Sequence, residues 1–490
     1  MSQRTAIRFL RRGQVVELAS VPPMQTVLDY LRLEEKSRGT KEGCNEGDCG
    51  ACTVALGTLR ESRIVYEPVN ACILLIGHLD GKELVTVDDL ADGDTLHPVQ
   101  QAMVESHGSQ CGFCTPGFIM ALFTLYHAGH RPARQEIVDQ IAGNLCRCTG
   151  YRPIVDAAAA SCKGKAIDRW AKGAKKAAAQ LAALDDGSDL MIGDATSFVA
   201  VPSNAATLAN LAVQYPGATI VAGATDVGLW ITKQLRNLPR VIHVGGVKAL
   251  HEIGDGPEHL SLGAAVTYAE AESHLAKIDP DVGEVLRRIG SKQVRCSGTI
   301  GGNIANGSPI GDMPPMLMAL GATLHLRHGG HMRQMALEDF FVAYGKQDRK
   351  PGELVWRVDI PKLKANEVFR SYKIAKRFDQ DISAVMAAFK FDLDSRRIAS
   401  ARIAFGGMAA TPKRATQTES ALAGVSLDKA SSWTAAIQAL AADYQPITDM
   451  RASASYRMEV AQALLRKALI EIAGMASGQT RVVGLRGEAA

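Results

Sequence analysis

A run of closely spaced cysteines constrains this chain more than any other feature of its sequence. Cys44, Cys49 and Cys52 follow the pattern C-x4-C-x2-C, and Cys72 comes after a longer gap. Side chains this close in sequence meet at one inorganic centre only if the backbone wraps around that centre. Glycines beside and between the cysteines supply the backbone freedom that such tight turns need. They are Gly43, Gly47 and Gly50.

The spacing of these four cysteines is that of a plant-type [2Fe-2S] loop. We therefore predict that Cys44, Cys49, Cys52 and Cys72 hold an iron–sulfur cluster that carries electrons. Zinc fits the pattern less well, because structural zinc sites usually take their cysteines in two C-x2-C pairs. Disulfides are also disfavoured, because nothing in the sequence marks the chain as secreted.

A second group of four cysteines lies in a stretch with helical periodicity. Cys111 and Cys114 form a C-x2-C pair, and Cys146 and Cys148 form a C-x-C pair. Each pair is expected at a helix boundary, where free backbone N–H groups stabilise a negatively charged centre. The pattern alone fits zinc and an iron–sulfur cluster equally well. The neighbouring first site favours a cluster, because two adjacent redox centres can pass electrons to each other.

Length and composition are those of an ordinary globular protein with several domains. The chain has 490 residues, 47% of them hydrophobic and 22% charged, and a formal charge of +4. Its Lys and Arg residues are scattered, so no nucleic-acid surface is indicated. No apolar window reaches about 18 residues, and the N-terminal residues lack a secretory signal. We expect a cytoplasmic protein that binds neither nucleic acid nor a membrane.

Two small-residue loops mark the second half of the chain. The first, over residues 221–228, follows an expected strand, and the second covers residues 296–306. Such loops let backbone N–H groups approach pyrophosphate oxygens closely. Neither is a G-x-G-x-x-G or a Walker A motif, so each alone is more simply a tight turn. The other two cysteines, Cys162 and Cys296, are expected to be small buried thiols.

The cysteine motifs with their flanking residues resemble the paired [2Fe-2S] domains of the xanthine dehydrogenase/aldehyde oxidase family of molybdenum hydroxylases. The matching segments are residues 44–54, 111–117 and 146–151, and all eight ligand positions are filled. The two glycine loops, which follow the cysteine motifs in the chain, resemble the flavin-binding domain of the same family. The resemblance implies two [2Fe-2S] clusters and FAD as cofactors.

Carried over position by position, the resemblance also implies which residues hold FAD. The diphosphate and adjoining groups would be held by Val221, Ala222, Gly223, Ala224, Thr225, Asp226, Val227 and Gly228, and by Gly298, Thr299, Ile300, Gly301, Gly302 and Asn303. Asp312 would contact the adenosine side, Val355 and Trp356 would lie on the strand bordering the flavin, and Lys373 would lie near the flavin. Asp381 falls in the region that admits NAD in dehydrogenase-type members.

The expected fold is α+β and multidomain. It begins with a β-grasp ferredoxin domain, in which residues 6–18 form a hairpin and Thr26 caps a helix. The predicted parts are the [2Fe-2S] ferredoxin domain over residues 1–80, a helical [2Fe-2S]-binding domain over 81–160, a linker or surface helix over 161–190, an α/β FAD-binding domain over 191–370, and a small α+β C-terminal flavoprotein domain over 371–480.

The family hydroxylates its substrate at a molybdenum-cofactor domain that is larger than this whole chain. The resemblance therefore implies an oxidoreductase in which a separate molybdopterin-binding large subunit is the partner, assembled as a dimer of heterodimers. In xanthine-oxidising members, electrons would pass from hypoxanthine or xanthine through the cluster on Cys111, Cys114, Cys146 and Cys148, then through the first cluster to FAD and NAD, with urate as product.

No catalytic residue is predicted in this chain, and its 12 histidines are expected to be packing or surface residues. Two alternatives stay open. One is the corresponding subunit of an aldehyde, carbon monoxide or other aromatic hydroxylase. The other is a metal-bound scaffold without enzymatic activity, which would carry zinc.

Overall fold

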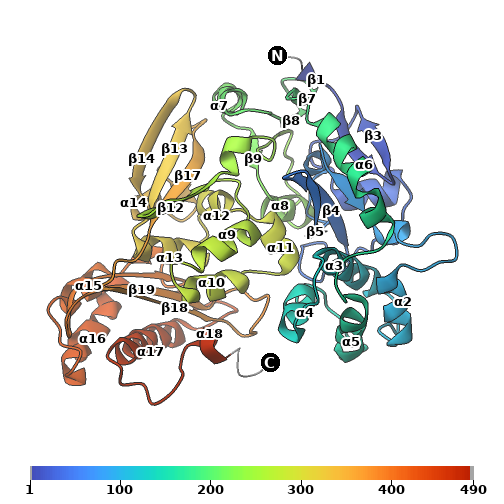
Figure 1. Cartoon of the computed structure of the whole chain (residues 1–490). Coiled ribbons are helices and arrows are strands. Elements are labelled where there is room, and N and C mark those ends of the chain that lie inside the picture. Colours follow the sequence, from blue (N-terminus) through green and yellow to red (C-terminus); the bar gives the residue numbers. More distant parts are fainter. Residues whose placement is uncertain (1–2, 486–490) are drawn as a thin grey trace. The chain divides into compact units, whose positions relative to one another are not determined.

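The computed structural model describes residues 3–485. They form two compact units with mixed helices and sheets (Figure 1). The first unit holds the chain up to Leu211 together with Tyr215–Lys248 and Gly290–Gly298. The second unit holds Ala212–Gln214, Ala249–Ile289 and the chain from Thr299 onward. The border between the units therefore runs through the predicted FAD-binding domain.

The first unit begins with a five-stranded sheet of the β-grasp type, in the order β3-β2-β6-β4-β5. Arg12 and Gly13 make the tight turn of the predicted hairpin, with φ angles of 52° and 73°. The central strand β6 lies beyond residue 80 and pairs with β2 and β4. The strands are β2 (Ile7–Arg11), β3 (Gln14–Leu18), β4 (Thr53–Arg60), β5 (Arg63–Asn70) and β6 (Glu83–Val85).

A short helical segment packs on this sheet. Helix α1 (Val27–Asp29) continues into a wider turn over Tyr30–Glu34. The predicted cap is confirmed, because the Thr26 hydroxyl accepts a 3.1 Å hydrogen bond from the Asp29 N–H. Leu28 and Leu31 are buried in the core of this sheet with Phe9.

Four helices, α2 to α5, follow in the chain, and α3 lies at the centre of their core. Nearly every side chain of α3 (Thr115–His127) is buried from Gly117 to Tyr126. Figure 1 shows α3 directly beneath β4 and β5 of the first sheet. The other helices are α2 (Pro98–Glu105), α4 (Arg134–Ile141) and α5 (Arg152–Ser161).

The segment predicted as a linker or surface helix contains a helix attached to the first sheet. Helix α6 (Arg169–Leu184) begins at Asp168, whose carboxylate accepts a 2.9 Å hydrogen bond from the Ala171 N–H. Leu181 and Leu184 are buried together with Leu10 of β2. Leu181 and Leu184, one turn apart, are thus the buried apolar side chains by which this alanine-rich helix packs on the sheet.

A second sheet of the first unit carries the predicted flavin loop. Its order is β1-β7-β8-β10-β9, and β8, β10 and β9 are parallel. Helix α8 (Val227–Thr232) follows β9, and α11 (Lys292–Ser297) belongs to the same unit. The strands are β1 (Gln3–Arg4), β7 (Asp189–Gly193), β8 (Phe198–Val201), β9 (Thr219–Val221) and β10 (Arg240–His243).

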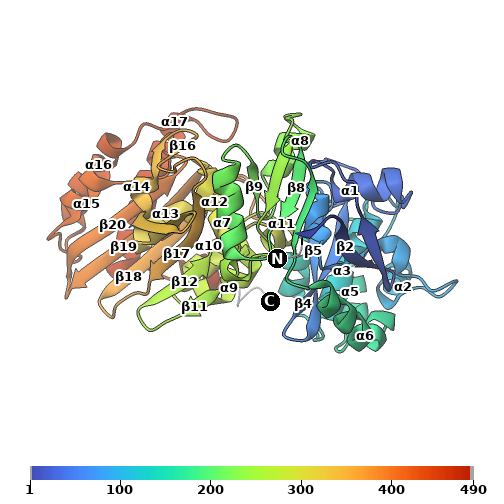
Figure 2. The ribbon, with the colours of Figure 1, turned by 90° about the horizontal axis from the view of Figure 1, so that it is seen from above.

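The second unit begins with a sheet in the order β11-β12-β17-β13-β14. Strands β11 and β12 form a hairpin beside β17 (Figure 2). The strands are β11 (Ile253–Asp255), β12 (His259–Gly263), β13 (Thr323–His328), β14 (His331–Ala336) and β17 (Leu354–Pro361). The helices are α9 (Tyr268–Leu275), α10 (Pro280–Arg287), α12 (Ile300–Asn306), α13 (Met313–Leu320) and α14 (Leu337–Phe340), and a small hairpin is made by β15 (Phe341–Ala343) and β16 (Lys346–Gln347).

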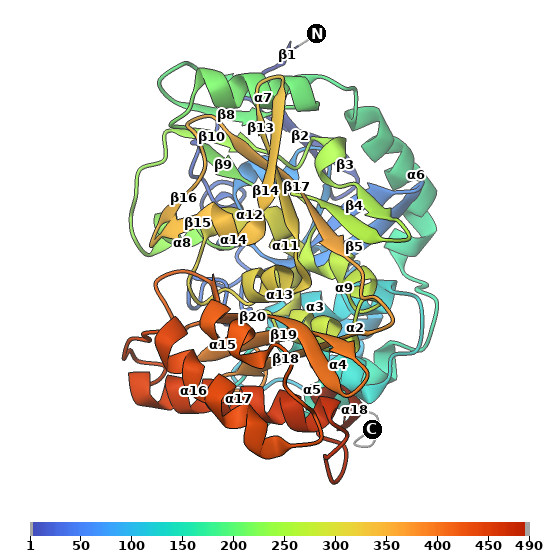
Figure 3. The same ribbon diagram turned by 90° about the vertical axis from the view of Figure 1, so that its left-hand side faces the viewer.

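The C-terminal sheet of the second unit is buried on both faces. Along β19 the side chains alternate, so that Met386 and Ala388 join one core while Val385 and Phe389 join the other. Helix α13 covers the first face, and α15, α16 and α17 cover the second (Figure 3). The strands are β18 (Glu367–Ile374), β19 (Val385–Asp394), β20 (Arg397–Gly406) and β21 (Lys413–Arg414). The helices are α15 (Thr416–Leu422), α16 (Thr434–Asp443), α17 (Ala454–Ile472) and α18 (Val482–Leu485).

The described helices include none that is both long and apolar enough to cross a bilayer. The remaining α-helix is α7 (Ala205–Gln214), whose residues up to Leu211 belong to the first unit and whose last three belong to the second.

Candidate cluster and flavin sites

The first cysteine loop brings backbone donors to sulfur. The Cys44 N–H donates to Cys49 Sγ at 3.3 Å, and the Cys49 N–H donates back to Cys44 Sγ at 3.3 Å. The Asp48 N–H reaches Cys44 Sγ at 3.4 Å. Hydrogen bonds of this kind favour the thiolate, which is the form of cysteine that ligates metals.

The electrostatics of the loop agree with this geometry. The pKa of the Cys44 thiol is lowered to about 5, first by a hydrogen bond from the Cys49 thiol, against the opposing effect of burial. Backbone N–H groups of Cys49, Glu46 and Asp48 lower it further. Cys49 is the donor of this pair, and its pKa is raised accordingly. Cys44 Sγ accepts two backbone N–H groups and Cys49 Sγ accepts one, so the loop favours the thiolate form more strongly at Cys44.

The other two sulfurs of the first site form a second pair. Cys52 and Cys72 are buried, with 2% and 1% exposure, and their thiols hydrogen-bond to each other. Within residues 3–485 no three or more Cys, His, Asp or Glu side chains are placed to hold a metal ion. The hydrogen bonds of the first site thus link Cys44 with Cys49 and Cys52 with Cys72.

Two glycines of the loop are required by close contacts. A Cβ atom on Gly43 would lie 2.7 Å from Cys49 Sγ. At Gly50 the φ angle is +70°, and a Cβ atom would lie 2.2 Å from the Gly143 carbonyl oxygen. The predicted role of these glycines thus has a steric cause: one makes room for sulfur and the other for a neighbouring backbone.

The second group of cysteines is also paired. Cys114 is the N-cap of α3, and its thiol hydrogen-bonds to that of Cys146, while Cys111 hydrogen-bonds to Cys148. The hydroxyl and N–H of Thr149 lie 3.2 and 3.5 Å from Cys146 Sγ. These bonds lower the pKa of Cys146, although burial alone would raise it. Cys146 is therefore a cysteine of this group whose thiolate form the surrounding hydrogen bonds favour.

The two cysteine sites are joined by a buried polar junction. The Leu145 N–H donates to the Cys49 carbonyl at 3.0 Å. Asn144 Nδ2 donates to the Gly50 carbonyl at 2.9 Å and contacts Thr53 Oγ1 at 3.2 Å. Gln293 of α11 donates to Asn144 Oδ1 at 2.8 Å. The sequence did not predict a role for Asn144 or Gln293, because a neutral amide side chain matches no ligand or turn motif.

The predicted flavin residues divide between the two units, and each group is described within its own unit. In the first unit, Val221 ends β9 and Ala224 has a φ angle of +57°. A Cβ atom on Gly223 would lie 1.7 Å from the Ser297 carbonyl oxygen, so only glycine fits there. Asp226 accepts a 2.9 Å hydrogen bond from Trp230 Nε1 at the start of α8. The loop from Val221 to α8 is thus a tightly packed turn at the carboxyl end of a parallel strand, the usual ligand-binding edge.

The second predicted loop, residues 296–306, is largely helical, which corrects the sequence expectation. Helix α11 ends at Ser297 and α12 begins at Ile300, with Gly298 and Thr299 between them. The Thr299 hydroxyl caps α12 by accepting a 3.0 Å hydrogen bond from the Gly302 N–H. Gly301 lies inside α12, where a Cβ atom would meet Ala264 at 2.4 Å. The glycine at this position is needed for close packing of the helix and does not indicate a loop.

In the second unit, Lys373 and Asp312 form a buried ion pair. Lys373 Nζ lies 2.5 Å from Asp312 Oδ2, and the Ser383 hydroxyl donates to Asp312 Oδ1 at 2.5 Å. The Arg288 guanidinium is also buried and donates to the carbonyl oxygens of Lys373 and Phe378 at 3.3 and 3.1 Å. Asp312 is therefore oriented by two donors, from β18 and from the segment that follows it.

The remaining predicted residues of the second unit lie on β17 and after β18. Val355 and Trp356 belong to β17, and the Arg327 guanidinium lies 4.5 Å from the centroid of the Trp356 ring. Asp381 accepts a 2.8 Å hydrogen bond from the Arg377 N–H, so its carboxylate fixes an exposed turn. Burial would raise the pKa of Asp381, but the backbone N–H groups of Arg377 and Ile382 and the charge of Arg377 together lower it.

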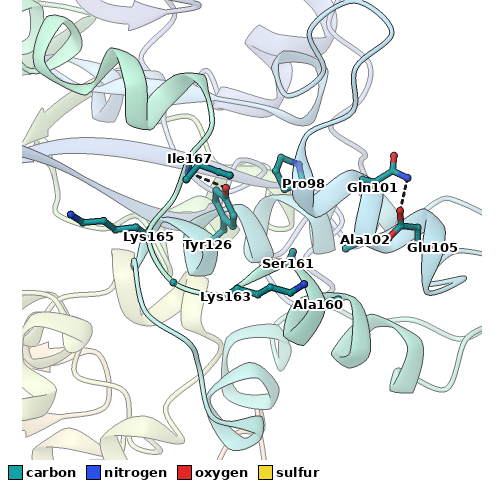
Figure 4. A pocket seen from close by; sticks show the side chains of 11 residues that line it. Pro98, Gln101, Ala102, Glu105, Tyr126, Ala160, Ser161, Lys163, Lys165 and Ile167 are labelled. Carbon is teal, nitrogen blue, oxygen red and sulfur yellow. Dashed lines mark hydrogen bonds between the residues drawn. The ribbon is translucent and has the colours of Figure 1, made fainter.

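A cavity of about 410 Å³ lies in the helical part of the first unit (Figure 4). Pro98 and Gln101 of α2 line one side, and Lys163, Lys165 and Ile167 line another. The Tyr126 hydroxyl accepts a hydrogen bond from the Ile167 N–H at 3.1 Å. The lining contains none of the predicted cofactor residues.

Four family models match successive parts of the chain. They are the 2Fe-2S iron–sulfur cluster binding domain over residues 11–76, the [2Fe-2S] binding domain over 86–159, the FAD binding domain in molybdopterin dehydrogenase over 194–363, and the CO dehydrogenase flavoprotein C-terminal domain over 370–472. Two iron–sulfur modules and two flavoprotein modules are thus present in one chain.

Known proteins of similar sequence and structure agree. Xanthine dehydrogenase/oxidase of Rattus norvegicus is 32% identical over 82% of this chain and 34% of its own length. The reconstituted CO dehydrogenase from Oligotropha carboxidovorans has 26% identity and a TM-score of 0.54 over 58% of this chain and 100% of the solved one. Quinoline 2-oxidoreductase from Pseudomonas putida 86 has 26% identity and a TM-score of 0.52 over 58% and 99%. The chain spans about a third of the length of the curated relatives it matches.

Proposed function

Because this chain belongs to the molybdenum hydroxylase family, in its iron–sulfur and flavin portion, we propose that it is the electron-transfer subunit of a xanthine dehydrogenase. In this proposal its partner is a molybdopterin-binding large subunit, its clusters are held by the eight cysteines of the two paired sites, and its electron acceptor is NAD. When bound, two [2Fe-2S] clusters and FAD supply one-electron carriage and its conversion to two-electron hydride chemistry.

The protein's own residues contribute position and electrostatics to this work. The N–H groups of Cys44, Asp48 and Cys49 direct positive charge at sulfur, which stabilises thiolate ligands. Asn144 holds the backbone of the first cysteine loop beside the second cysteine site. Lys373 keeps a buried positive charge in the second unit, paired with Asp312.

One observation carries the preference for xanthine dehydrogenase. The rat xanthine dehydrogenase/oxidase aligns over 82% of this chain. The solved CO dehydrogenase and quinoline 2-oxidoreductase chains are almost fully covered and yet match only 57–58% of it. Fusion of clusters and flavin in one polypeptide therefore supports the first reading. The second candidate is the equivalent subunit of an aldehyde, carbon monoxide or other aromatic hydroxylase, which the structural matches support.

The test is a substrate comparison on the assembled enzyme. The chain is co-expressed with its proposed molybdopterin-binding partner, and the purified complex is assayed for NADH formation with xanthine, hypoxanthine and aldehydes. NADH formation with the purines and not with aldehydes is the expected result. Activity confined to aldehydes would favour the second candidate, and a preparation that binds neither iron nor flavin would overturn both.

A further inference from the structure

The chain immediately after Cys72 forms one wall of the predicted flavin loop. Ile73 is packed so closely on α8 that a Cβ atom on Gly228 would lie 2.6 Å from the Ile73 Cβ atom and 2.7 Å from its carbonyl oxygen. Leu75 is fully buried in a cluster with Val221 and Ala224. A segment of the ferredoxin domain thus shapes a loop that belongs to the flavoprotein part of the sequence.

His78 adds a polar contact between this wall and the loop. Its Nε2 lies 2.7 Å from the Ala222 carbonyl oxygen, and its Nδ1 lies 3.0 Å from the Leu75 carbonyl oxygen. The shorter contact joins two positions that are 144 residues apart in sequence. The His78 ring also meets the His243 ring edge-on, with centroids 4.6 Å apart.

The direction of the Ala222 carbonyl matters for a loop that binds an anion. Such a loop offers backbone N–H groups to its ligand and has to turn its carbonyl oxygens away. The next residue, Gly223, is pressed against the Ser297 carbonyl and has no freedom to compensate. A neutral imidazole has one N–H, and we place it on Nε2, which makes the shorter of the two carbonyl contacts. The His78 N–H then gives the Ala222 carbonyl a hydrogen-bond donor.

We propose that His78 is a positioning residue for FAD, which acts by holding the Ala222 carbonyl and so fixing the flavin loop. This inference rests on the proposed function, in which residues 221–228 hold the FAD diphosphate. It makes the ferredoxin domain part of the flavin-binding apparatus, and it gives a specific role to one of the histidines that the sequence reading left among packing or surface residues.

His243 provides a matched control. Its ring is 2% exposed and packs against His78 and Gly77, and its ring nitrogens have no hydrogen-bond partner among the described residues. His78→Phe and His243→Phe therefore make the same change in two touching rings, but only the first removes a hydrogen bond to the loop. His78→Gln restores a donor, because the Gln amide nitrogen reaches the position of Nε2.

The experiment measures the Kd of FAD for the full chain freed of flavin, by quenching of flavin fluorescence, with iron content and Tm recorded for each variant. We expect His78→Phe to weaken FAD binding roughly tenfold, as the loss of one buried hydrogen-bond partner does. His78→Gln and His243→Phe should stay within about threefold of the wild type on the same scale. Iron content should be equal in all four proteins.

Three results would overturn the inference: unchanged FAD affinity in His78→Phe, an equal loss in His243→Phe, or no recovery in His78→Gln. If His78→Phe does not fold, His78→Asn replaces it, because its shorter amide corresponds to Nδ1 and does not reach Ala222. A wild-type chain that binds no FAD would instead overturn the proposed function. The two failures are therefore distinguishable.

Discussion

Gln293 Nε2 donates a 2.8 Å hydrogen bond to Asn144 Oδ1, and both side chains are almost fully buried, with 0% and 1% exposure. Asn144 precedes Cys146 by two positions, and Gln293 lies in the segment matched by the FAD-binding model. Asn144 also reaches the Gly50 carbonyl beside Cys49. One amide side chain therefore ties together three parts of the chain that family comparison treats as separate modules.

Removing this amide is expected to destabilise the first unit. Asn144→Ala removes one donor from the Gly50 carbonyl, which also accepts from the Thr53 N–H and hydroxyl, and one acceptor from the Gln293 amide, which also donates to Thr53 Oγ1. The lost buried hydrogen bonds and the cavity left behind should lower the free energy of unfolding by about 1–3 kcal/mol. The urea midpoint of the variant measures this. Gln101→Ala, at an exposed side chain that donates a hydrogen bond to Glu105, should move the midpoint little. Equal midpoints for the two variants would contradict the role given to Asn144.

Gly50→Ala should prevent the first cysteine loop from closing. The new Cβ atom would lie 2.2 Å from the Gly143 carbonyl oxygen, and the φ angle of +70° is itself unfavourable for alanine. Gly112→Ala separates the two effects, since Gly112 has a φ angle of +83° but no atom within 4 Å of the added Cβ. We expect about half of the visible iron–sulfur absorbance to be lost in Gly50→Ala, because one of two clusters is affected. It should be kept in Gly112→Ala, which should be less stable by only about 1 kcal/mol.

Iron content tests the assignment of the cysteines. A chain with two [2Fe-2S] clusters holds about four irons, two per cluster. Cys52→Ser should remove about half of them, because it breaks the buried pair with Cys72. Cys162→Ser changes an equally buried thiol outside both sites and should keep all of them. Elemental analysis of anaerobically purified protein decides the matter, and iron loss in Cys162→Ser would speak against the assignment.

The ion pair of Lys373 and Asp312 is expected to behave as a buried pair. The two side chains are 1% and 7% exposed, so Lys373→Met leaves a carboxylate without its counter-ion and should lower the free energy of unfolding by about 3–5 kcal/mol. Adding Asp312→Asn to the same chain should recover part of that loss, because no unpaired charge remains. Lys248→Met breaks an exposed pair with Asp185 and should have little effect. A double variant that is less stable than Lys373→Met would refute this account.

Acid should selectively weaken the attachment of α6. His97 Nε2 and His127 Nε2 both lie 2.8 Å from Asp168 Oδ2. Burial would raise the pKa of Asp168, but the hydrogen bonds from His127 and His97 outweigh burial and hold that pKa well below its ordinary range. A carboxylate of this kind stabilises the fold above its unfolded pKa of about 3.9, and that contribution is lost as the pH falls through the folded pKa.

We expect the stabilities of the wild type and Asp168→Asn to converge in acid. Urea midpoints of the wild type and Asp168→Asn should differ most at neutral pH, and the difference should shrink as the pH falls below about 4. Asp428→Asn, which changes an exposed partner of Arg396, should show a small difference at every pH. A gap between wild type and Asp168→Asn that widens in acid would contradict the assigned sign.

Much of the fold follows from local signals in the sequence. The hairpin turn at Arg12 and Gly13, the cap at Thr26 and the strand before the loop at residues 221–228 all depend on neighbouring residues, and the structure contains them. The family match supports the two cluster domains and the flavin domain as well. The ligand positions of the individual cysteines and flavin residues stay predictions.

What the sequence did not reveal are contacts between distant positions. Gln293 and Asn144 are 149 residues apart, and His78 and Ala222 are 144 residues apart. No periodicity or motif marks a neutral amide or a single histidine as a partner for a distant backbone. The segment 296–306 is expected to be a loop because of its glycines, but it is largely helical. Gly301 packs against Ala264, and the sequence alone does not distinguish a glycine needed for packing from one needed for a turn.

The first unit combines segments from different sequence modules, and this bears on where the gene of such a protein could be split. Residues 215–248 and 290–298 share a compact unit with both cysteine sites, although they belong to the flavin module by sequence. If the polypeptide were cut in the exposed stretch after α6, the contacts of Gln293 with Asn144 and of His78 with Ala222 would become contacts between two chains. The contacts within the first unit would thus serve as the interface of a heterodimer. Splitting the gene at this point would turn an internal contact surface into a subunit interface, and no new surface would have to evolve.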